Sequence, residues 1–166
     1  MCKVSSTEPQ GITYYWGADI DGAEPDTLWG LEGYTHAVGF FMGHPSSEIF
    51  KHEMQLVDDD KLLRHVQGLA SPDYDLKHYD HAGGWFTRDD DPDKCSTDSH
   101  VAVCHFFCQK QKRDEVIKIL CNFADETKKL QSSGGAVQSC GVLKECNDMT
   151  LVTLWLRYVY SCSPQA

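Results

Sequence analysis

The feature that most constrains the fold of this chain is a β-hairpin pattern that occurs twice. The first copy covers residues 11–16 and 26–34, and the second covers residues 139–144 and 150–158. Each copy has a β-rich run, a short polar turn that carries Asp, and a second β-rich run that ends on Tyr. This pattern is typical of two antiparallel strands. Because a repeated unit suggests duplication, we expect two related β-rich modules.

The spacing of the apolar residues predicts a helix after the first hairpin and another before the second. Residues 45–57 carry apolar side chains at helical spacing, and the serine pair at 46–47 can cap that helix. Residues 112–130 give the strongest helical pattern of the chain, whereas 81–87 and 100–108 are predicted strands. The predicted order is therefore β-β-α-β followed by β-α-β-β.

This order predicts an α+β fold made of two partial ferredoxin-like modules. Residues 1–87 form the first module, the acidic stretch 88–99 is a linker, and residues 100–160 form the second module. A complete ferredoxin-like unit is β-α-β-β-α-β, so each half lacks outer elements. With 166 residues we expect the halves to pack as one structural unit. Strands without neighbours leave exposed edges, which predicts pairing between halves or a homodimer.

The charge and the cysteine pattern exclude several classes of function. The net charge is −10, and the basic residues form no continuous stripe, so we expect neither nucleic acid nor an anionic membrane as a partner. We find no apolar run of membrane-spanning length and no signal-peptide core, which predicts a soluble, cytoplasmic protein. The 8 cysteines lack CxxC spacing, so we expect free thiols and no metal site.

Several short segments resemble one known family. These segments are 8–16, with the sequence EPQGITYYW, then 27–34, 43–50, 101–107, 112–116 and 141–158. They are similar to the antibiotic biosynthesis monooxygenase-like proteins of the dimeric α+β barrel superfamily, in a tandem form found in fungal secondary-metabolite pathways. The resemblance implies a barrel or paired sheets that enclose a pocket for an aromatic polyketide-type substrate. It also implies chemistry without metal, flavin or haem, so no cofactor is expected.

The resemblance leaves three functions open. The first is a cofactor-independent monooxygenase that oxidises a phenol or anthrone with dioxygen. The second is a non-oxidative cyclase, isomerase or lactonising enzyme of the same fold, and the third is a non-catalytic binding partner of a pathway enzyme. Both enzymatic reactions begin with a base that removes a proton and with donors that hold the resulting oxyanion.

Histidine is the side chain best suited to remove a proton near neutral pH. His44 lies at the start of the first predicted helix, after an apolar run, and His36 lies shortly before it. The resemblance adds weight to this region, because the family often carries a polar group there that faces the cavity. His105 lies inside a predicted strand, where a hydrogen-bonded core role is the alternative. These three histidines are the candidate catalytic residues.

Candidate substrate contacts are aromatic and basic residues on or beside the predicted strands. They are Trp29, Tyr34, Phe41, His81, Trp85, Trp155 and Arg157. Core packing is the alternative for each aromatic residue, since strands favour aromatic side chains. Arg157 shares a strand face with Trp155, and this face lines either a cavity or the solvent. The stretch 78–81 could bind a metal with nearby carboxylates, but we favour a solvated loop.

Overall fold

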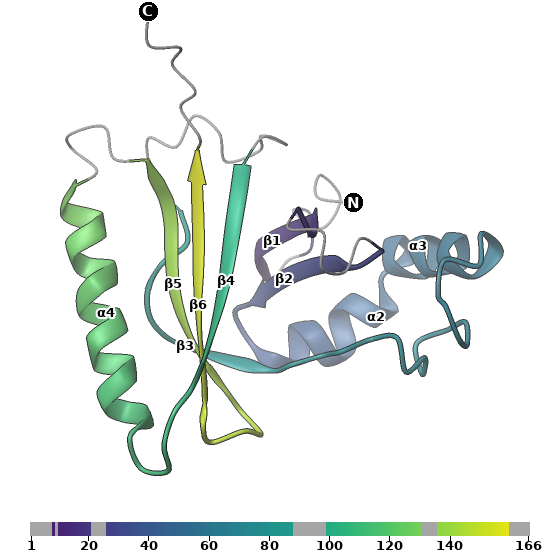
Figure 1. Ribbon diagram of the computed structural model, residues 1–166. Coiled ribbons are helices and arrows are strands. Elements are labelled where there is room, and N and C mark those ends of the chain that lie inside the picture. Colours follow the sequence, from purple (N-terminus) through teal and green to yellow (C-terminus); the bar gives the residue numbers. More distant parts are fainter. Residues whose placement is uncertain (1–7, 9, 21–25, 88–98, 131–135, 160–166) are drawn as a thin grey trace, which may run out of the picture. The chain divides into compact units, whose positions relative to one another are not determined.

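The computed structural model describes residues 8, 10–20, 26–87, 99–130 and 136–159. The chain is mixed α+β with two antiparallel sheets, which confirms the predicted class at this level (Figure 1). It divides into two compact units, Met1–Asp75 and Leu76–Ala166. Residues 88–98 of the predicted linker 88–99, and the last residue of the second predicted module, lie outside the described residues, whereas Ser99 begins a strand.

The first unit contains the first predicted hairpin. Strands β1 (Gly11–Ala18) and β2 (Leu28–Tyr34) pair in antiparallel fashion, and Tyr14 lies opposite Glu32. Side chains alternate between the two faces of a strand, so Tyr14, Glu32 and Tyr34 share one face of this hairpin. The register therefore brings two phenol rings and a carboxylate together.

Three consecutive helical segments follow β2. They are the π-helix η1 (Gly39–Gly43), the short helix α2 (His44–Ser46) and the helix α3 (Glu48–Asp59). Ser47 has extended backbone angles, and its hydroxyl accepts a hydrogen bond of 3.2 Å from a backbone N–H of the first turn of α3. This confirms the predicted cap. The single predicted helix therefore begins later than expected and is preceded by two short helical turns.

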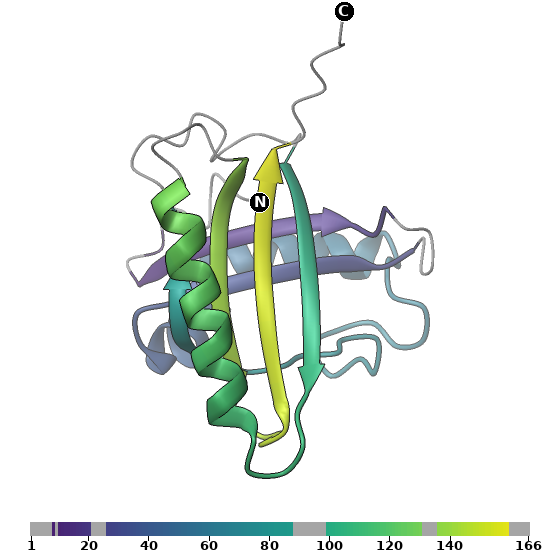
Figure 2. The ribbon, with the colours of Figure 1, turned by 60° about the vertical axis from the view of Figure 1, so that its left-hand side comes forward.

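The second unit is a four-stranded antiparallel sheet with one helix. The strands are β3 (Tyr79–Trp85), β4 (Ser99–Phe107), β5 (Val137–Glu145) and β6 (Leu151–Val159), and their order in the sheet is β3-β5-β6-β4. Helix α4 (Arg113–Lys129) joins β4 to β5 and lies along one face of the sheet (Figure 2). No helix in the described parts of the chain is long and apolar enough to cross a membrane.

Strand β3 pairs differently from what its place in the sequence suggests. The sequence placed this strand in the first module, whereas β3 forms hydrogen bonds with β5 in the second unit. Gly84 has a φ of +81°, and a Cβ atom there would lie 2.1 Å from the carbonyl oxygen of Cys140. Only glycine fits at this close approach of the two strands.

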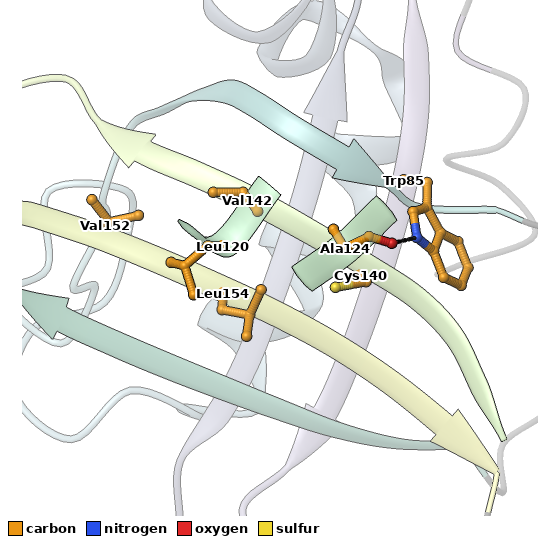
Figure 3. Packing of buried hydrophobic residues seen from close by; sticks show 7 residues of the cluster. All are labelled: Trp85, Leu120, Ala124, Cys140, Val142, Val152 and Leu154. Atoms are coloured by element: carbon orange, nitrogen blue, oxygen red, sulfur yellow. Dashed lines mark hydrogen bonds between the residues drawn. The ribbon is translucent and has the colours of Figure 1, made fainter. Parts of the chain in front are cut away.

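The hydrophobic core lies between α4 and the sheet of the second unit. Figure 3 shows the buried cluster, which consists of Trp85, Leu120, Ala124, Cys140, Val142, Val152 and Leu154. The indole N–H of Trp85 donates a 3.0 Å hydrogen bond to the carbonyl oxygen of Ala124, which ties β3 to α4. Among the described residues, every fully buried hydrophobic side chain belongs to the second unit.

Candidate functional site

The first unit contains a polar cluster around the carboxylate of Glu8. This carboxylate accepts hydrogen bonds from the Tyr14 hydroxyl at 2.7 Å and from Nδ1 of His44 at 2.9 Å. The hydroxyl of Ser47 donates a third hydrogen bond at 3.1 Å. Glu8 thereby connects β1, α2 and the N-cap of α3 through a single side chain.

The cluster continues through Glu32 and closes into a ring. The hydroxyl oxygen of Tyr34 lies 2.7 Å from that of Tyr14 and 3.1 Å from Oε2 of Glu32. The same carboxylate oxygen lies 3.6 Å from Nε2 of His44. We call the ring of Glu8, Tyr14, Tyr34, Glu32 and His44 the Glu8–His44 network.

The members of this network are largely withdrawn from solvent, and this changes their acidity. The side chains of Glu8 and His44 are each 11% exposed. Burial alone would raise the pKa of Glu8, but the hydrogen bonds donated by Tyr14, His44 and Ser47 outweigh it and hold the pKa of Glu8 below its ordinary value. Glu8 is therefore ionised at neutral pH.

The two tyrosines shift in the opposite direction. Burial raises the pKa of Tyr14, and the carboxylates of Glu8 and Glu32 raise it further. Burial also raises the pKa of Tyr34, with smaller contributions from Tyr14 and Glu32. Both hydroxyls therefore keep their protons at neutral pH and act as hydrogen-bond donors.

The geometry around His44 gives its two ring nitrogens different roles. Glu8 accepts the hydrogen bond of Nδ1, which makes Nε2 the basic nitrogen of the neutral imidazole. Aromatic rings surround the imidazole, with centroids at 4.4 Å for Phe50, 5.8 Å for Tyr34 and 6.5 Å for Tyr14. A carboxylate that orients an imidazole beside protonated hydroxyls is an arrangement able to accept and return a proton.

Glu8→Gln is expected to destabilise the first unit by about 1.5–3 kcal/mol at pH 7, because charge-assisted hydrogen bonds are lost. The pKa of Glu8 is lowered in the folded protein, so its stabilising effect is present above its unfolded-state pKa and disappears as pH falls through the folded-state pKa. Urea unfolding at pH 7 and at successively lower pH values, followed by near-UV circular dichroism, measures both effects.

Glu48→Gln serves as the control for this experiment, because Glu48 is an exposed residue at the start of α3 whose carboxylate, within the described part of the chain, pairs with the exposed Lys51. It should unfold much as the wild type does at pH 7. Equal stabilities of wild type and Glu8→Gln at pH 7 would show that Glu8 does not hold the first unit together.

The other two candidate catalytic histidines lie outside the network. His36 is exposed after β2, and its carbonyl oxygen accepts the hydrogen bond of Gly39 that begins η1. His105 lies on β4 of the second unit, where Nδ1 is 2.8 Å from Oγ1 of Thr153. Thr153 in turn donates to the hydroxyl of Tyr79 at 3.2 Å. His105 thus has hydrogen-bonded neighbours of its own in the second unit.

The predicted substrate contacts of the first unit are Trp29, Tyr34 and Phe41, and the structure places one of them in the network and the other two elsewhere. Tyr34 belongs to the Glu8–His44 network. Trp29 is 43% exposed and lies on the face of β2 opposite to Tyr34. Phe41 is 62% exposed in η1, and its ring centroid lies 5.0 Å from that of Phe40.

In the second unit, Trp155 and Arg157 share the face of β6 that points away from α4. Val152 and Leu154, at even-numbered positions of β6, pack in the core against α4. The odd-numbered positions of β6, which include Trp155 and Arg157, therefore lie on the other face. This confirms that Trp155 and Arg157 share a face. Arg157 is buried and donates hydrogen bonds to the Ser99 hydroxyl at 3.2 Å and to a backbone carbonyl at 3.5 Å.

The two remaining predicted contacts come from β3. His81 is exposed, and its ring centroid lies 5.1 Å from that of Phe86. Trp85 is buried in the core beneath α4, and this packing accounts for its position. The segment Tyr79–His81 is part of β3 rather than a loop. In the described parts of the chain, no three His, Cys, Asp or Glu side chains are arranged to hold a metal ion.

The sequence patterns did not indicate the two carboxylates that flank His44. Glu8 precedes the first predicted strand, and nothing local indicates that its side chain returns to the helices. Glu32 offers a clearer signal, because an acidic residue two positions before Tyr34 shares a strand face with it. The register of the hairpin then adds Tyr14 to the same face.

Comparison with known proteins adds no further assignment to this geometry. No protein-family model, no curated protein and no solved structure matches the chain.

Proposed function

We propose that the chain is an enzyme that uses cofactor-independent acid–base chemistry on an aromatic polyketide-type small molecule, with His44 as the base. The observation that carries this proposal is the hydrogen bond between Glu8 and Nδ1 of His44, which leaves Nε2 as the proton acceptor. The rings of Phe50 and Tyr34 give the imidazole aromatic neighbours suited to a flat substrate.

In this proposal His44 removes a proton from a phenol or from an activated carbon atom. The negative charge of Glu8 stabilises the imidazolium that forms. The hydroxyl of Tyr34 keeps its proton and donates a hydrogen bond to Glu32, and it becomes a donor to the developing oxyanion when it turns from Glu32 to the substrate. This division of roles requires the substrate to approach Nε2 on the side of Glu32.

Oxygenation is our first choice for the reaction, and it rests on the family resemblance. The deprotonated substrate adds dioxygen at carbon to form a peroxide, and loss of water from the peroxide leaves a carbonyl group. Dioxygen is the oxidant, and one of its oxygen atoms ends in the product and the other in water.

A non-oxidative isomerase or cyclase is the second candidate, and one distance favours it. Oε2 of Glu32 lies 3.6 Å from Nε2 of His44, close enough for a carboxyl group to relay a proton back to the substrate. A reaction that removes a proton and returns it elsewhere needs such a second group.

We also propose that the second unit belongs to a ferredoxin-like dimeric α+β barrel and that the chain forms a homodimer. The succession β4, α4, β5 and β6, with β6 between β4 and β5 in the sheet, supports the ferredoxin-like assignment. Strand β4 is at the edge of the sheet and pairs with β6. Sedimentation equilibrium of the full chain tests the dimer.

The reaction is tested with metal-stripped protein and a panel of anthrone, phenol and polyketide-lactone substrates, in air and under strict anaerobiosis, with oxygen uptake recorded. Turnover that stops without oxygen supports the oxygenase. Turnover that persists makes the protein a cyclase or isomerase. The absence of turnover in both atmospheres would leave the non-catalytic binding role as the better description.

A further inference from the structure

A groove of about 330 Å³ runs along α3 in the first unit. Phe50, Met54 and Asp58 form one wall, and they share a helix face because they are four residues apart. The distance along the helix axis from the first to the last is about 12 Å. Gly68 and Leu69 also line the groove, and Gly68 has a φ of +91° that a side chain would disfavour.

The groove is apolar at one end and acidic at the other. Phe50 and Met54 supply flat and flexible apolar surfaces, and Leu69 adds a further apolar side chain to the lining. Lys51 also lines the groove, but its ammonium group pairs with Glu48 at 2.7 Å. The charge that remains is the carboxylate of Asp58, two helical turns beyond Phe50.

Asp58 is the unusual member of this lining. Its Oδ1 atom is buried and accepts no hydrogen bond, and its carboxylate forms no ion pair with any of the described residues. Burial raises the pKa of Tyr74, and the negative charge of Asp58 raises it further. A carboxylate beside an apolar wall is unfavourable unless a donor or a cation compensates it.

We propose that this groove binds a small aromatic cation, with a flat apolar body against Phe50, Met54 and Leu69 and a protonated amine at Asp58. The charge of the surrounding sequence agrees with a cationic ligand, because residues 1–75 include 13 acidic and 4 basic residues. This binding site does not depend on catalysis by His44.

The test is isothermal titration calorimetry of the full chain with three probes that share one ring system. They are 2-naphthylmethylamine, which is cationic, 2-naphthylmethanol, which is neutral, and 2-naphthoic acid, which is anionic. We expect the amine to bind at least about tenfold more tightly than the alcohol, because a hydrogen bond to a charged group adds affinity. The acid should bind most weakly.

Asp58→Asn should remove the preference for the amine and leave the affinity for the alcohol unchanged. Asp60→Asn is the matched control, because Asp60 is exposed two residues further along and does not line the groove. Far-UV circular dichroism checks that both variants keep their helices. Calorimetry measures binding without turnover, so the result with the amine is independent of the outcome of the proposed reaction.

Two results would overturn the inference. One is equal affinity of the wild type for amine and alcohol, or no binding of the amine up to its solubility limit, and this comparison needs no variant. The other is an equal effect of Asp58→Asn and Asp60→Asn on amine binding, which would assign the preference to the general negative charge of the protein rather than to the groove.

Discussion

Replacement of His44 by glutamine is expected to lower the turnover number of the proposed reaction by about 10²–10⁴-fold, the usual contribution of a general base. The glutamine amide can still donate a hydrogen bond to Glu8, so the connection between β1 and α2 is largely kept. The basic nitrogen at Nε2 is lost. The measurement is the steady-state rate with whichever substrate of the panel the wild type converts.

Two other histidines provide the comparison for this variant. His52→Gln changes an exposed residue on α3 and should leave the rate within about twofold of wild type, as most exposed substitutions do. His36→Gln tests the competing candidate from the sequence, and we expect little effect because His36 is exposed outside the network. A rate for His44→Gln equal to that of these controls would rule out His44 as the base.

Gly84→Ala is expected to destabilise the second unit by more than about 3 kcal/mol. Two causes add together. The φ of +81° at Gly84 is unfavourable for any residue with a Cβ atom, and this atom would lie 2.1 Å from the carbonyl oxygen of Cys140. Strand β3 would have to separate from β5, and the indole of Trp85 next in sequence would lose its place in the core. Urea unfolding followed by tryptophan fluorescence measures the loss.

Two other glycines, Gly17 and Gly83, serve as comparisons for Gly84. At Gly17 an added Cβ atom meets nothing within 4 Å, so Gly17→Ala should be neutral or slightly stabilising. At Gly83 the nearest atom is the thiol of Cys121, a side chain that can move, so Gly83→Ala should cost less than Gly84→Ala. Equal stabilities of the Gly83 and Gly84 variants would show that the backbone of β5 does not limit the position of β3.

The elements that the sequence predicted well are those specified by local pattern. The β-rich runs at 11–16 and 26–34, and at 139–144 and 150–158, marked both hairpins, and the helical spacing of 112–130 closely matches α4. The cap at Ser47 was also visible, because a serine before an acidic first turn is a local signal. In each case the information lies within a few residues.

The features that the sequence did not reveal depend on distant contacts. Strand β3 joins β5 although 51 residues separate Trp85 from the start of that strand at Val137, and no local pattern specifies such a partner. The π-helix η1 lies in an apolar run with glycine at both ends, which gives no clear helical period. The partnership of Glu8 with His44 spans 36 positions and requires the fold itself.

Among the described residues, the fully buried apolar side chains all belong to the second unit, and this has a thermodynamic consequence. The increase in heat capacity on unfolding and the sensitivity to denaturant both scale with the apolar surface that becomes exposed. Since the described part of the first unit has no fully buried hydrophobic side chain, its unfolding should have a shallow dependence on urea and a small heat-capacity increment. The half of the chain that contains the candidate site would then open and close more readily than the half that contains the core, which is the kind of local stability on which ligand entry depends.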